Sequence, residues 1–391
     1  MKKKTFIVIV HTALIYMLSS CISAYEAVDM EDMSGLLVVE GVILEEGTKI
    51  TLSRTVRLNE SLYPGYLFEG VNYATIHVID EAYNVVAVAE QESNWGPYIV
   101  KEKFSFVPGM KYALDIEVYW KHYQSAFVEP VNTPEIDSVS WNLNDDNSID
   151  IMVSTHDPGN ATLYCLWDFE ENWELRATFF GRARYDPITQ SVIQQSLTGD
   201  NRYYCWASDH SKSLLLSSSE KYSDAVIKEH RIHTLQPGNH RYSYLYSINV
   251  RQYRLSREAS VYYNNLQRNI EDSGSLFAPQ PSEITGNIRC LSDPEETAIG
   301  YIFASKTATS RLFIPMEELR LNRFEGLPDC SDIEQQFSDP SVAYYSEYGI
   351  MNTDGREGFI YISRQCVDCT ERRGAGMPDK TKPDFWPNEH Q

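Results

Sequence analysis

The 391-residue sequence is short of basic residues and of long apolar runs. It contains 34 Lys and Arg against 55 Asp and Glu, which gives a formal net charge of −21. Binding to nucleic acid or to anionic lipid by charge needs clustered Lys and Arg, so this balance argues against both partners. After the first 20 residues, no apolar run approaches the roughly 20 residues that a membrane-spanning helix requires.

The sequence also lacks the motifs of common catalytic sites. It contains no Gly-x-Ser-x-Gly, P-loop or His-Glu-x-x-His motif. Apolar residues make up 42% and charged residues 23%, which excludes disordered, collagenous and coiled-coil chains. The length fits two or three ordinary domains. We therefore expect a folded, non-enzymatic protein that uses no metal and no cofactor.

Residues 1–20 have the features of a secretory signal. Three lysines precede a short apolar stretch, Thr5 to Leu18, which ends in Leu18-Ser19-Ser20-Cys21. This ending resembles the lipobox of bacterial lipoproteins, which implies cleavage before Cys21 and attachment of fatty acyl chains to it. Several acyl chains make a stable anchor, and loss of the three lysines leaves a formal charge of −24. The alternative is an ordinary cleaved signal that happens to precede a cysteine.

Residues 21–35 form an acidic tether, with four acidic residues between Glu26 and Asp32. An acidic stretch just after the lipidated cysteine resembles the surface-export signal of Bacteroides-type lipoproteins. It equally suits a solvated linker between membrane and domain. We expect a lipid-anchored protein of the outer membrane, on its periplasmic or its cell-surface face.

The remaining chain is predicted to be mainly β. Residues 36–130 show short strands separated by turns, and the clearest, 112–118, alternates apolar and polar positions. This spacing predicts an N-terminal immunoglobulin- or transthyretin-like β-sandwich. A Pro-Val-Asn-Thr-Pro linker at 130–134 then leads into a larger β-rich region, residues 135–391.

Within that region we predict one hairpin and one helix in particular. Residues 162–169 and 173–180 are predicted to pair as a hairpin that turns through Glu170, Glu171 and Asn172. Residues 256–271 are predicted to form an amphipathic helix. Its stripe would contain Ala259, Tyr263, Leu266 and Ile270, with Ser256 as N-cap.

Several short motifs resemble one family, the domain of unknown function 4249 family of Bacteroidota envelope lipoproteins. They are Gly274-Ser275-Leu276-Phe277, Gln280-Pro281-Ser282, Gly286-Asn287-Ile288, Ala298-Ile299-Gly300-Tyr301-Ile302, Cys366-Val367-Asp368-Cys369 and Lys382-Pro383-Asp384-Phe385-Trp386. The resemblance extends over essentially the whole chain after the signal. It implies an envelope lipoprotein, often encoded beside a TonB-dependent outer-membrane receptor, and it implies no catalytic residues.

Six cysteines remain after Cys21. They are Cys165, Cys205, Cys290, Cys330, Cys366 and Cys369. An even number in an exported chain fits up to three disulfides, in 15 full pairings. Cys366 and Cys369 form a Cys-x-x-Cys motif, but neither a redox fold nor a second pair of zinc ligands accompanies it. We therefore predict structural disulfides, with Cys330 and Cys290 as candidates to bridge this tail motif to the body.

The 26 tyrosines are the other abundant feature, and they admit two interpretations. Tyrosine forms strands well and tolerates half-burial, which explains most of them. Aromatic rings on a sheet can also stack on a glycan or peptide ligand. The candidates for stacking are Tyr203, Tyr204, Trp206, Tyr344, Tyr345 and Tyr348.

Three groups of polar residues are candidates for sites of chemistry. Glu170, Glu171 and Glu174 offer a carboxylate pair for glycoside hydrolysis, but a solvated hairpin corner suits them better. His230 and His233 would lie on opposite faces of a strand, which disfavours a metal site. Asn144, Asp146, Ser148 and Asp150 alternate as calcium ligands do, yet the glycine and the distal glutamate of a calcium loop are missing.

The leading hypothesis is a non-enzymatic binding or accessory subunit of a TonB-dependent nutrient-uptake system. The alternatives are a stand-alone carbohydrate- or peptide-binding module, an adhesin-like structural component and an envelope hydrolase.

Overall fold

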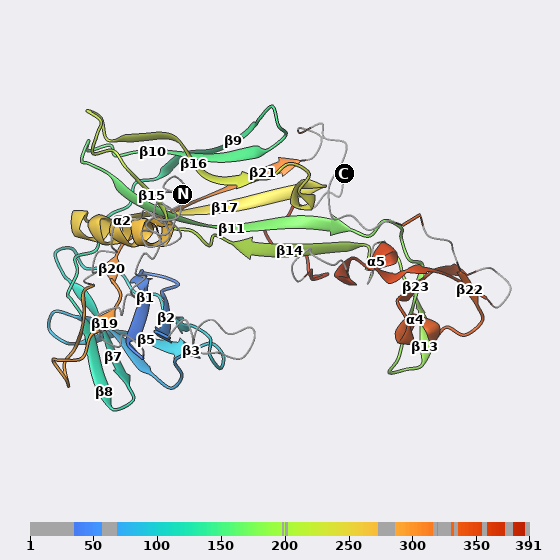
Figure 1. Ribbon diagram of the computed structural model, residues 1–391, viewed down its shortest axis with the longest axis horizontal. Coiled ribbons are helices and arrows are strands. Elements are labelled where there is room, and N and C mark those ends of the chain that lie inside the picture. The colour runs from blue at the N-terminus through green and yellow to red at the C-terminus, as the bar shows by residue number, and fades with distance from the viewer. Residues whose placement is uncertain are drawn as a thin grey trace, which may run out of the picture.

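The computed structural model describes residues 35–56, 69–197, 199, 202–272, 286–315, 319, 330–331, 335–353, 358–371 and 378–387. Cys21, the signal and the first 14 residues of the tether lie outside this part of the chain. The protein is mainly β, with 48% strand and 10% helix. Figure 1 shows an N-terminal sheet at the lower left, a central region above it, and a small C-terminal unit at the far right.

The N-terminal sheet has 11 strands. They are β1 (Leu37–Ile43), β2 (Lys49–Arg54), β3 (Glu69–Gly70), β4 (Thr75–Asp80), β5 (Val85–Gln91), β6 (Tyr98–Val100), β7 (Tyr112–Val118), β8 (Lys121–Ser125), β18 (Ile288–Cys290), β19 (Ala298–Ile299) and β20 (Phe303–Ala304). The hydrogen-bonded path runs β18-β8-β7-β4-β5-β6-β2-β1-β19, so the successive strands β18 and β19 stand at its two ends and nearly close the sheet. The sandwich expected here is not confirmed, because all these strands belong to one hydrogen-bonded sheet.

Strand β7 illustrates why this segment forms a sheet. Tyr112, Leu114, Ile116 and Val118 are buried, as their alternation predicts, and they line the core inside the curved sheet. Ala113 on the opposite face is buried as well. The alternation in sequence thus fixes the face that the strand turns to the core.

Two glycines permit the closure by residues 286–304. A Cβ on Gly300 would lie 2.1 Å from the carbonyl oxygen of Val39, and its φ of +141° is unfavourable for any other residue. A Cβ on Gly286 would lie 1.9 Å from the carbonyl oxygen of Gly300. Between them, the Asn287 side chain donates to Ile302 O at 2.7 Å and accepts from Ile302 N at 2.8 Å. The motifs at 286–288 and 298–302 therefore have a structural role in closing the N-terminal sheet.

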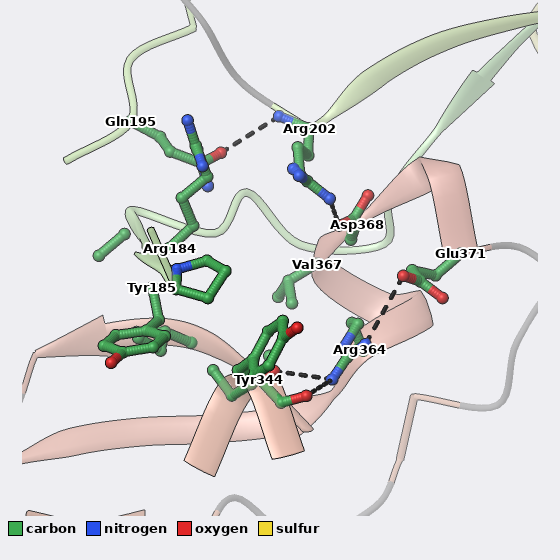
Figure 2. Close-up of a pocket in the computed structure, with 14 residues that line it drawn as sticks. Arg184, Tyr185, Gln195, Arg202, Tyr344, Arg364, Val367, Asp368 and Glu371 are labelled. Atoms are coloured by element: carbon green, nitrogen blue, oxygen red, sulfur yellow. Dashed lines mark hydrogen bonds and ion pairs between the residues drawn. The ribbon is translucent and has the colours of Figure 1, made fainter. Parts of the chain in front are cut away.

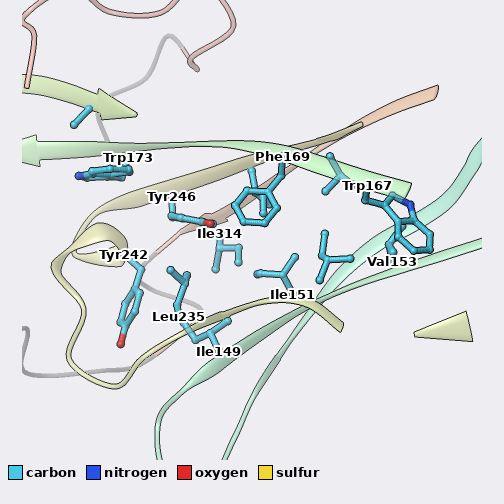
Figure 3. Packing of buried hydrophobic residues seen from close by; sticks show 14 of the residues in the cluster. Ile149, Ile151, Val153, Trp167, Phe169, Trp173, Leu235, Tyr242, Tyr246 and Ile314 are labelled. Carbon is cyan, nitrogen blue, oxygen red and sulfur yellow. The ribbon is translucent and has the colours of Figure 1, made fainter. Parts of the chain in front are cut away.

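The central region consists of two sheets with a shared core. One contains β9 (Ile136–Leu143), β10 (Ile149–His156) and β16 (Val226–Leu235); the other contains β11 (Tyr164–Arg176), β14 (Tyr204–His210), β15 (Leu215–Ser218), β17 (Leu245–Arg254) and β21 (Thr307–Pro315). Figure 3 shows Ile149 and Ile151 of the first sheet facing Phe169, Tyr246 and Ile314 of the second. Burial of this apolar surface is the main stabilising term for the region.

The hairpin predicted at residues 162–180 is wrong. β11 is a single strand of 13 residues that passes straight through Glu170, Glu171 and Asn172 and pairs with β14 on one side and β17 on the other. A run of polar residues usually marks a turn because buried charges are costly. Here distant side chains neutralise the charges, and local sequence does not reveal such partners.

Helix α2 (Arg257–Asp272) occupies the segment where the sequence predicts a helix. The Ser256 hydroxyl accepts from Ala259 N at 3.1 Å and so caps its first turn. Ala259 is fully buried and packs with Leu44 of the N-terminal sheet region and Tyr253 of β17. Ile270, expected on the buried stripe, is 59% exposed, so only the first turns of the helix join the core.

The C-terminal unit is small. It contains β12 (Ala183–Asp186), β13 (Ser191–Gln194), β22 (Gln335–Phe337), α4 (Val342–Tyr345), β23 (Tyr348–Thr353), β24 (Phe359–Ser363), α5 (Arg364–Val367) and the 3-10 turn η2 (Cys369–Glu371). Its two clusters of buried apolar residues have three members each. The tail after it returns to the central sheet, where Trp386 is buried against Phe313.

Candidate functional site

A pocket of about 260 Å³ lies in the C-terminal unit, between the β12–β13 hairpin, helix α4 and helix α5. Figure 2 shows Arg184 and Tyr185 on one side, with Tyr344, Arg364 and Asp368 on the others. These residues come from segments more than 150 positions apart in the sequence. The pocket therefore exists only when the unit is folded.

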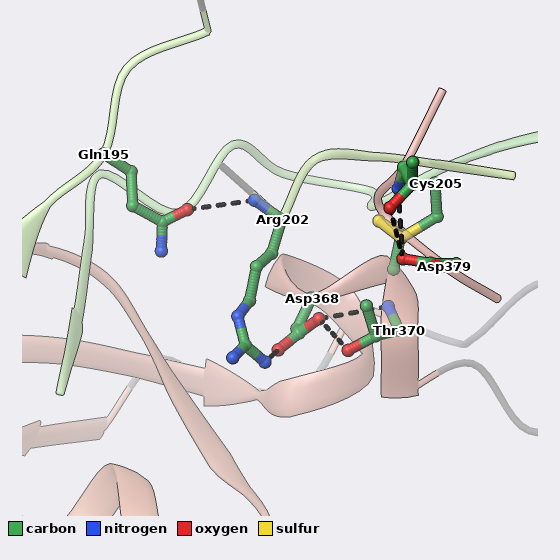
Figure 4. Close-up of a disulfide and its surroundings, with 8 residues drawn as sticks. Gln195, Arg202, Cys205, Asp368, Thr370 and Asp379 are labelled. Atoms are coloured by element: carbon green, nitrogen blue, oxygen red, sulfur yellow. Dashed lines mark hydrogen bonds and ion pairs between the residues drawn. A yellow bond between two sulfur atoms is a disulfide. The ribbon is translucent and has the colours of Figure 1, made fainter. Parts of the chain in front are cut away.

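One wall of the pocket is built on Asp368. Its Oδ2 accepts from Arg202 Nη1 at 2.6 Å, and its Oδ1 accepts from the backbone and hydroxyl of Thr370 at 3.0 and 2.6 Å. Arg202 is fixed further by Gln195, which accepts from Arg202 N at 3.1 Å. Figure 4 shows these contacts beside the Cys205 disulfide. The carboxylate and the guanidinium are thus held in one geometry by charge-assisted hydrogen bonds.

The same wall continues with Arg364, one helical turn before Asp368. Its Nη2 donates to the carbonyl oxygens of Ala343, at 2.7 Å, and of Ser346, while its Nη1 lies 3.6 Å from Glu371 Oε1. The guanidinium thereby satisfies carbonyls at the end of α4, which have no partner inside a short helix. This arrangement fixes the position of Tyr344, the aromatic side chain of α4 that lines the pocket.

Two disulfides tie the unit together. Cys205 of β14 pairs with Cys369 of η2, and Cys330 pairs with Cys366 of α5. The two cysteines of the Cys-x-x-Cys motif are therefore in different disulfides, as structural links rather than as a redox pair. The prediction that Cys330 bridges the tail motif to the body agrees with its disulfide to Cys366, whereas the same prediction for Cys290 is wrong, because Cys290 is buried as a free thiol in the N-terminal sheet.

Cys165 is also a free, buried thiol. Burial in the central core raises its pKa to about 12. It therefore stays protonated and unreactive, and the chain has two disulfides among the described residues rather than the maximum of three.

The candidate stacking residues divide into two groups in the structure. Trp206 is buried, and its backbone pairs with that of Asp379, so its ring does not face solvent. Tyr203 packs edge-to-face on Tyr204 at 4.7 Å, and the guanidinium of Arg176 lies 5.5 Å from the ring centre of Tyr204. The rings around Cys205 thus pack within the protein.

The second group lies in helix α4 and at the start of β23, in the C-terminal unit. Tyr344 is 52% exposed and Tyr345 is 81% exposed, and the two rings meet edge-to-face at 4.9 Å. Tyr348 packs against Phe337 of β22 instead. Only Tyr344 of the six candidates lines the pocket. Arg202, Arg364 and Glu371 were not anticipated, because nothing in the sequence near them signals that they converge.

The glutamates of β11 do not form a pair across a cleft. Glu171 and Glu174 are both buried, but they lie on opposite faces of the strand. Glu171 pairs with Arg241 and accepts from the Tyr246 hydroxyl at 2.8 Å. Glu174 accepts from Arg176 Nε at 2.6 Å. Each carboxylate is neutralised within the structure, and the solvated corner expected for them is wrong.

His230 and His233 lie on the same face of β16, contrary to expectation. A bulge between them shifts the register by one residue, so His230 stacks on Trp167 at 5.1 Å and His233 packs on Phe169 at 4.7 Å. Among the described residues, no group of three or more His, Cys, Asp or Glu is arranged to hold a metal ion.

The segment from Asn144 to Ser148 is the turn between β9 and β10. Asp146 Oδ1 accepts from the backbone and hydroxyl of Ser148 at 2.9 and 2.7 Å, and Asn147 adopts a φ of 65°. These are the contacts of a hairpin turn. They confirm the turn interpretation over the calcium loop.

Comparison with known families gives one match. Residues 25–311 match the model of the Domain of unknown function (DUF4249) family, so the chain belongs to that family. The match ends before the Cys-x-x-Cys motif and the tail, although these contributed to the resemblance. No curated protein matches the chain. In the part of the chain that the structure describes, no helix has both the length and the apolar character needed to cross a membrane.

Proposed function

We propose that this protein is a non-enzymatic, lipid-anchored subunit of the bacterial outer membrane that acts beside a TonB-dependent receptor. The proposal rests on one observation: the charged side chains of the C-terminal pocket are paired with other groups of the protein. Arg202 is bonded to Asp368, and Arg364 is bonded to backbone carbonyls and lies near Glu371. Side chains that are already bonded in this way are suited to positioning a binding partner. They are poorly suited to transferring protons or attacking a substrate.

The sequence and the disulfides support the location. The lipobox-like ending at Cys21 provides an attachment point for acyl chains. Disulfides persist in oxidising compartments such as the bacterial periplasm and the cell surface. The family resemblance to Bacteroidota envelope lipoproteins favours the same compartment and supplies the receptor as the expected partner.

The chemistry of the pocket fits a protein partner. Tyr344 and Tyr345 are exposed beside partly exposed guanidinium and carboxylate groups of both signs. Tyrosine and arginine are enriched at the centres of protein interfaces, where a flat ring and a planar cation pack closely. We infer that a segment of the receptor docks here, with one side chain in the pocket.

The test is affinity purification of the tagged full-length protein from intact membranes. The wild-type protein is expected to recover a TonB-dependent receptor, and the variant Tyr344→Ala with Tyr345→Ala to recover at least tenfold less. Tyr222→Ala is the matched control, since Tyr222 is 70% exposed but lies in the central region. Recovery of the lipoprotein alone from wild-type membranes would refute the partnership.

The anchor is tested separately by Cys21→Ser. This variant is expected to leave the membrane fraction while keeping its fold, because residue 21 precedes every described element. A Cys21→Ser protein that stays in the membrane fraction would refute lipid anchoring at this residue.

A further inference from the structure

One end of the N-terminal sheet carries four exposed aromatic residues in a left-handed backbone conformation. Tyr73, Trp95, Tyr119 and Trp120 have φ values of 61°, 65°, 50° and 65°. Their exposed fractions are 89%, 61%, 52% and 103%. Three separate turns supply them, and the register of β4, β5 and β7 places these turns at the same end.

The conformation is costly for such side chains. Tyr119 and Trp120 form the two-residue turn between β7 and β8, where Val118 pairs with Lys121. A turn with two positive φ values normally contains Asn-Gly, because Cβ atoms are strained in this region. Each such residue costs about 1–3 kcal/mol, and strained residues of this kind concentrate at functional sites. Trp120 is completely exposed, so packing within the fold does not offset its cost.

The turns are held in place by side-chain hydrogen bonds. The Asn72 side-chain oxygen accepts from Trp95 N at 2.7 Å and from Gln91 Nε2 at 2.6 Å. The guanidinium of Arg54 lies 4.7 Å from the ring centre of Tyr119. Neither Tyr73 nor Trp120 stacks on another ring within the described residues. The aromatic turns are therefore fixed, while these two rings remain open to solvent.

Three of these aromatic residues line one groove. Tyr73, Tyr119 and Trp120 form its apolar part, and Glu117 and His122 contribute polar groups. Ring faces beside hydrogen-bonding side chains are the combination that binds a ligand with both apolar and hydroxyl-bearing surfaces.

The charges around the groove favour a neutral ligand. Lys121 pairs with Glu296, so the lysine that lines the groove is already compensated, and His122 Nε2 lies 2.6 Å from Asp115 Oδ1. Glu117 has no ion pair among the described residues and offers carboxylate oxygens as hydrogen-bond acceptors. An anionic ligand would meet this carboxylate, while the neighbouring guanidinium of Arg54 is held against the Tyr119 ring and donates to the carbonyl oxygen of Gly35 at 2.6 Å.

We propose that this groove binds a neutral oligosaccharide. The C–H faces of its sugar rings stack on Trp120 and Tyr73, and its hydroxyl groups donate to Glu117. The site lies in the N-terminal sheet, away from the C-terminal pocket, so the inference goes beyond the proposed receptor partnership.

The test uses the detergent-solubilised full-length protein in affinity gel electrophoresis. The probes are the neutral polysaccharides mannan, xylan, galactan and dextran, with the anionic polysaccharide pectin for comparison. We expect at least one neutral probe to retard the wild-type protein and pectin not to. Trp120→Ala and Tyr73→Ala are each expected to weaken binding at least tenfold. Tyr83→Ala is the matched control: Tyr83 is 66% exposed with a φ of 63°, but at the opposite end of β4.

A second variant separates binding from folding. Tyr119→Asn combined with Trp120→Gly installs the preferred turn sequence and removes both rings. This variant is expected to keep or raise the melting temperature and to lose binding. Three outcomes of the electrophoresis would overturn the proposal: binding that survives these substitutions, retardation by pectin alone, or no retardation by any neutral probe. A wild-type protein that binds no polysaccharide but binds phosphatidylcholine vesicles through Trp120 would also overturn it. Receptor recovery by Trp120→Ala stays at the wild-type level, so this test and that of the partnership fail independently.

Discussion

The N-terminal sheet and the C-terminal unit are stabilised in different ways. The sheet encloses a cluster of 22 buried apolar residues and leaves its cysteine, Cys290, as a free thiol. The C-terminal unit has two clusters of three buried residues and contains parts of both disulfides. A small unit buries too little apolar surface to hold together by itself, and cross-links compensate for this. The comparison indicates that the pocket depends on oxidation and that the aromatic groove does not.

The largest effect is expected from removing both disulfides. Each disulfide contributes about 2–5 kcal/mol, largely by restricting the unfolded chain. Replacing Cys205, Cys369, Cys330 and Cys366 by Ala is expected to open the C-terminal unit and leave the N-terminal sheet folded. Hydrogen exchange measures this as lost protection in β12, β13, β22, β23 and β24, with protection retained in the N-terminal sheet. The control is Cys290→Ala, and equal loss of protection in β7 would contradict the comparison.

The second-largest effect is expected from breaking the charge network of the central region. Arg241→Met leaves Glu171 buried without its arginine and leaves Asp209, 2.9 Å from Arg241 Nη2, with only the exposed Lys212 as a partner. We expect a loss of about 3–5 kcal/mol in the free energy of unfolding, as is usual for a buried charge that loses its partner. Urea titration measures it. Lys101→Met, which breaks an exposed pair with Glu90, is the control and is expected to have no measurable effect.

The closure of the N-terminal sheet is tested at Gly300. Gly300→Ala is expected to cost about 2–3 kcal/mol, because its Cβ would collide with the Val39 carbonyl oxygen and its φ is strained. Gly47→Ala is the matched control, since Gly47 has a φ of +72° but no atom lies within 4 Å of the added Cβ. A loss of about 1 kcal/mol in the free energy of unfolding is expected for this variant. Equal losses for the two variants, measured by thermal unfolding, would show that closure does not depend on this contact.

The smallest effect concerns pH and the two histidines of β16. Burial lowers the pKa of His230 and of His233. Although His233 Nε2 is 3.5 Å from Glu171, that carboxylate is already paired with Arg241 and does not hold a proton on the ring. The unfolded chain, with an ordinary pKa near 6.5, therefore binds protons first as the pH falls.

The contribution of these two histidines to stability is thus expected to be constant above about pH 7.5 and to fall as the pH drops below about 6.5. Each histidine contributes a slope of at most about 1.4 kcal/mol per pH unit. The variant His230→Gln with His233→Gln is expected to show a shallower slope in urea titrations at several pH values. An unchanged slope would contradict the assignment to these two residues.

The sequence predicts the local structure better than the long-range contacts. The alternation at 112–118 correctly predicts which residues of β7 are buried, and the segment after Ser256 is helical as expected. Both signals depend on neighbouring residues. By contrast, Glu170 to Asn172 suggested a turn because their partners are distant in sequence: Arg241 pairs with Glu171, and Arg311 donates to the Asn172 side chain.

The same limit applies to the site. Tyr344 was a candidate from its aromatic neighbourhood, but Arg202 and Arg364 reach the pocket only through the chain path and the disulfides. The sequence does not predict the exposed aromatic turns of the N-terminal sheet, because neither the exposure of a side chain nor a positive φ can be inferred from it. The full set of disulfide pairings could not be assigned from the sequence for the same reason, since disulfide pairing follows from spatial proximity.

The most direct test of the proposed partnership is photo-crosslinking in intact cells. A photoreactive amino acid replaces Tyr345, at the C-terminal pocket, or Tyr222, on the central region; both positions are exposed. The account predicts a crosslink to a TonB-dependent receptor from position 345 and none from position 222. A receptor crosslink of equal yield from both positions, or none from position 345, would contradict it.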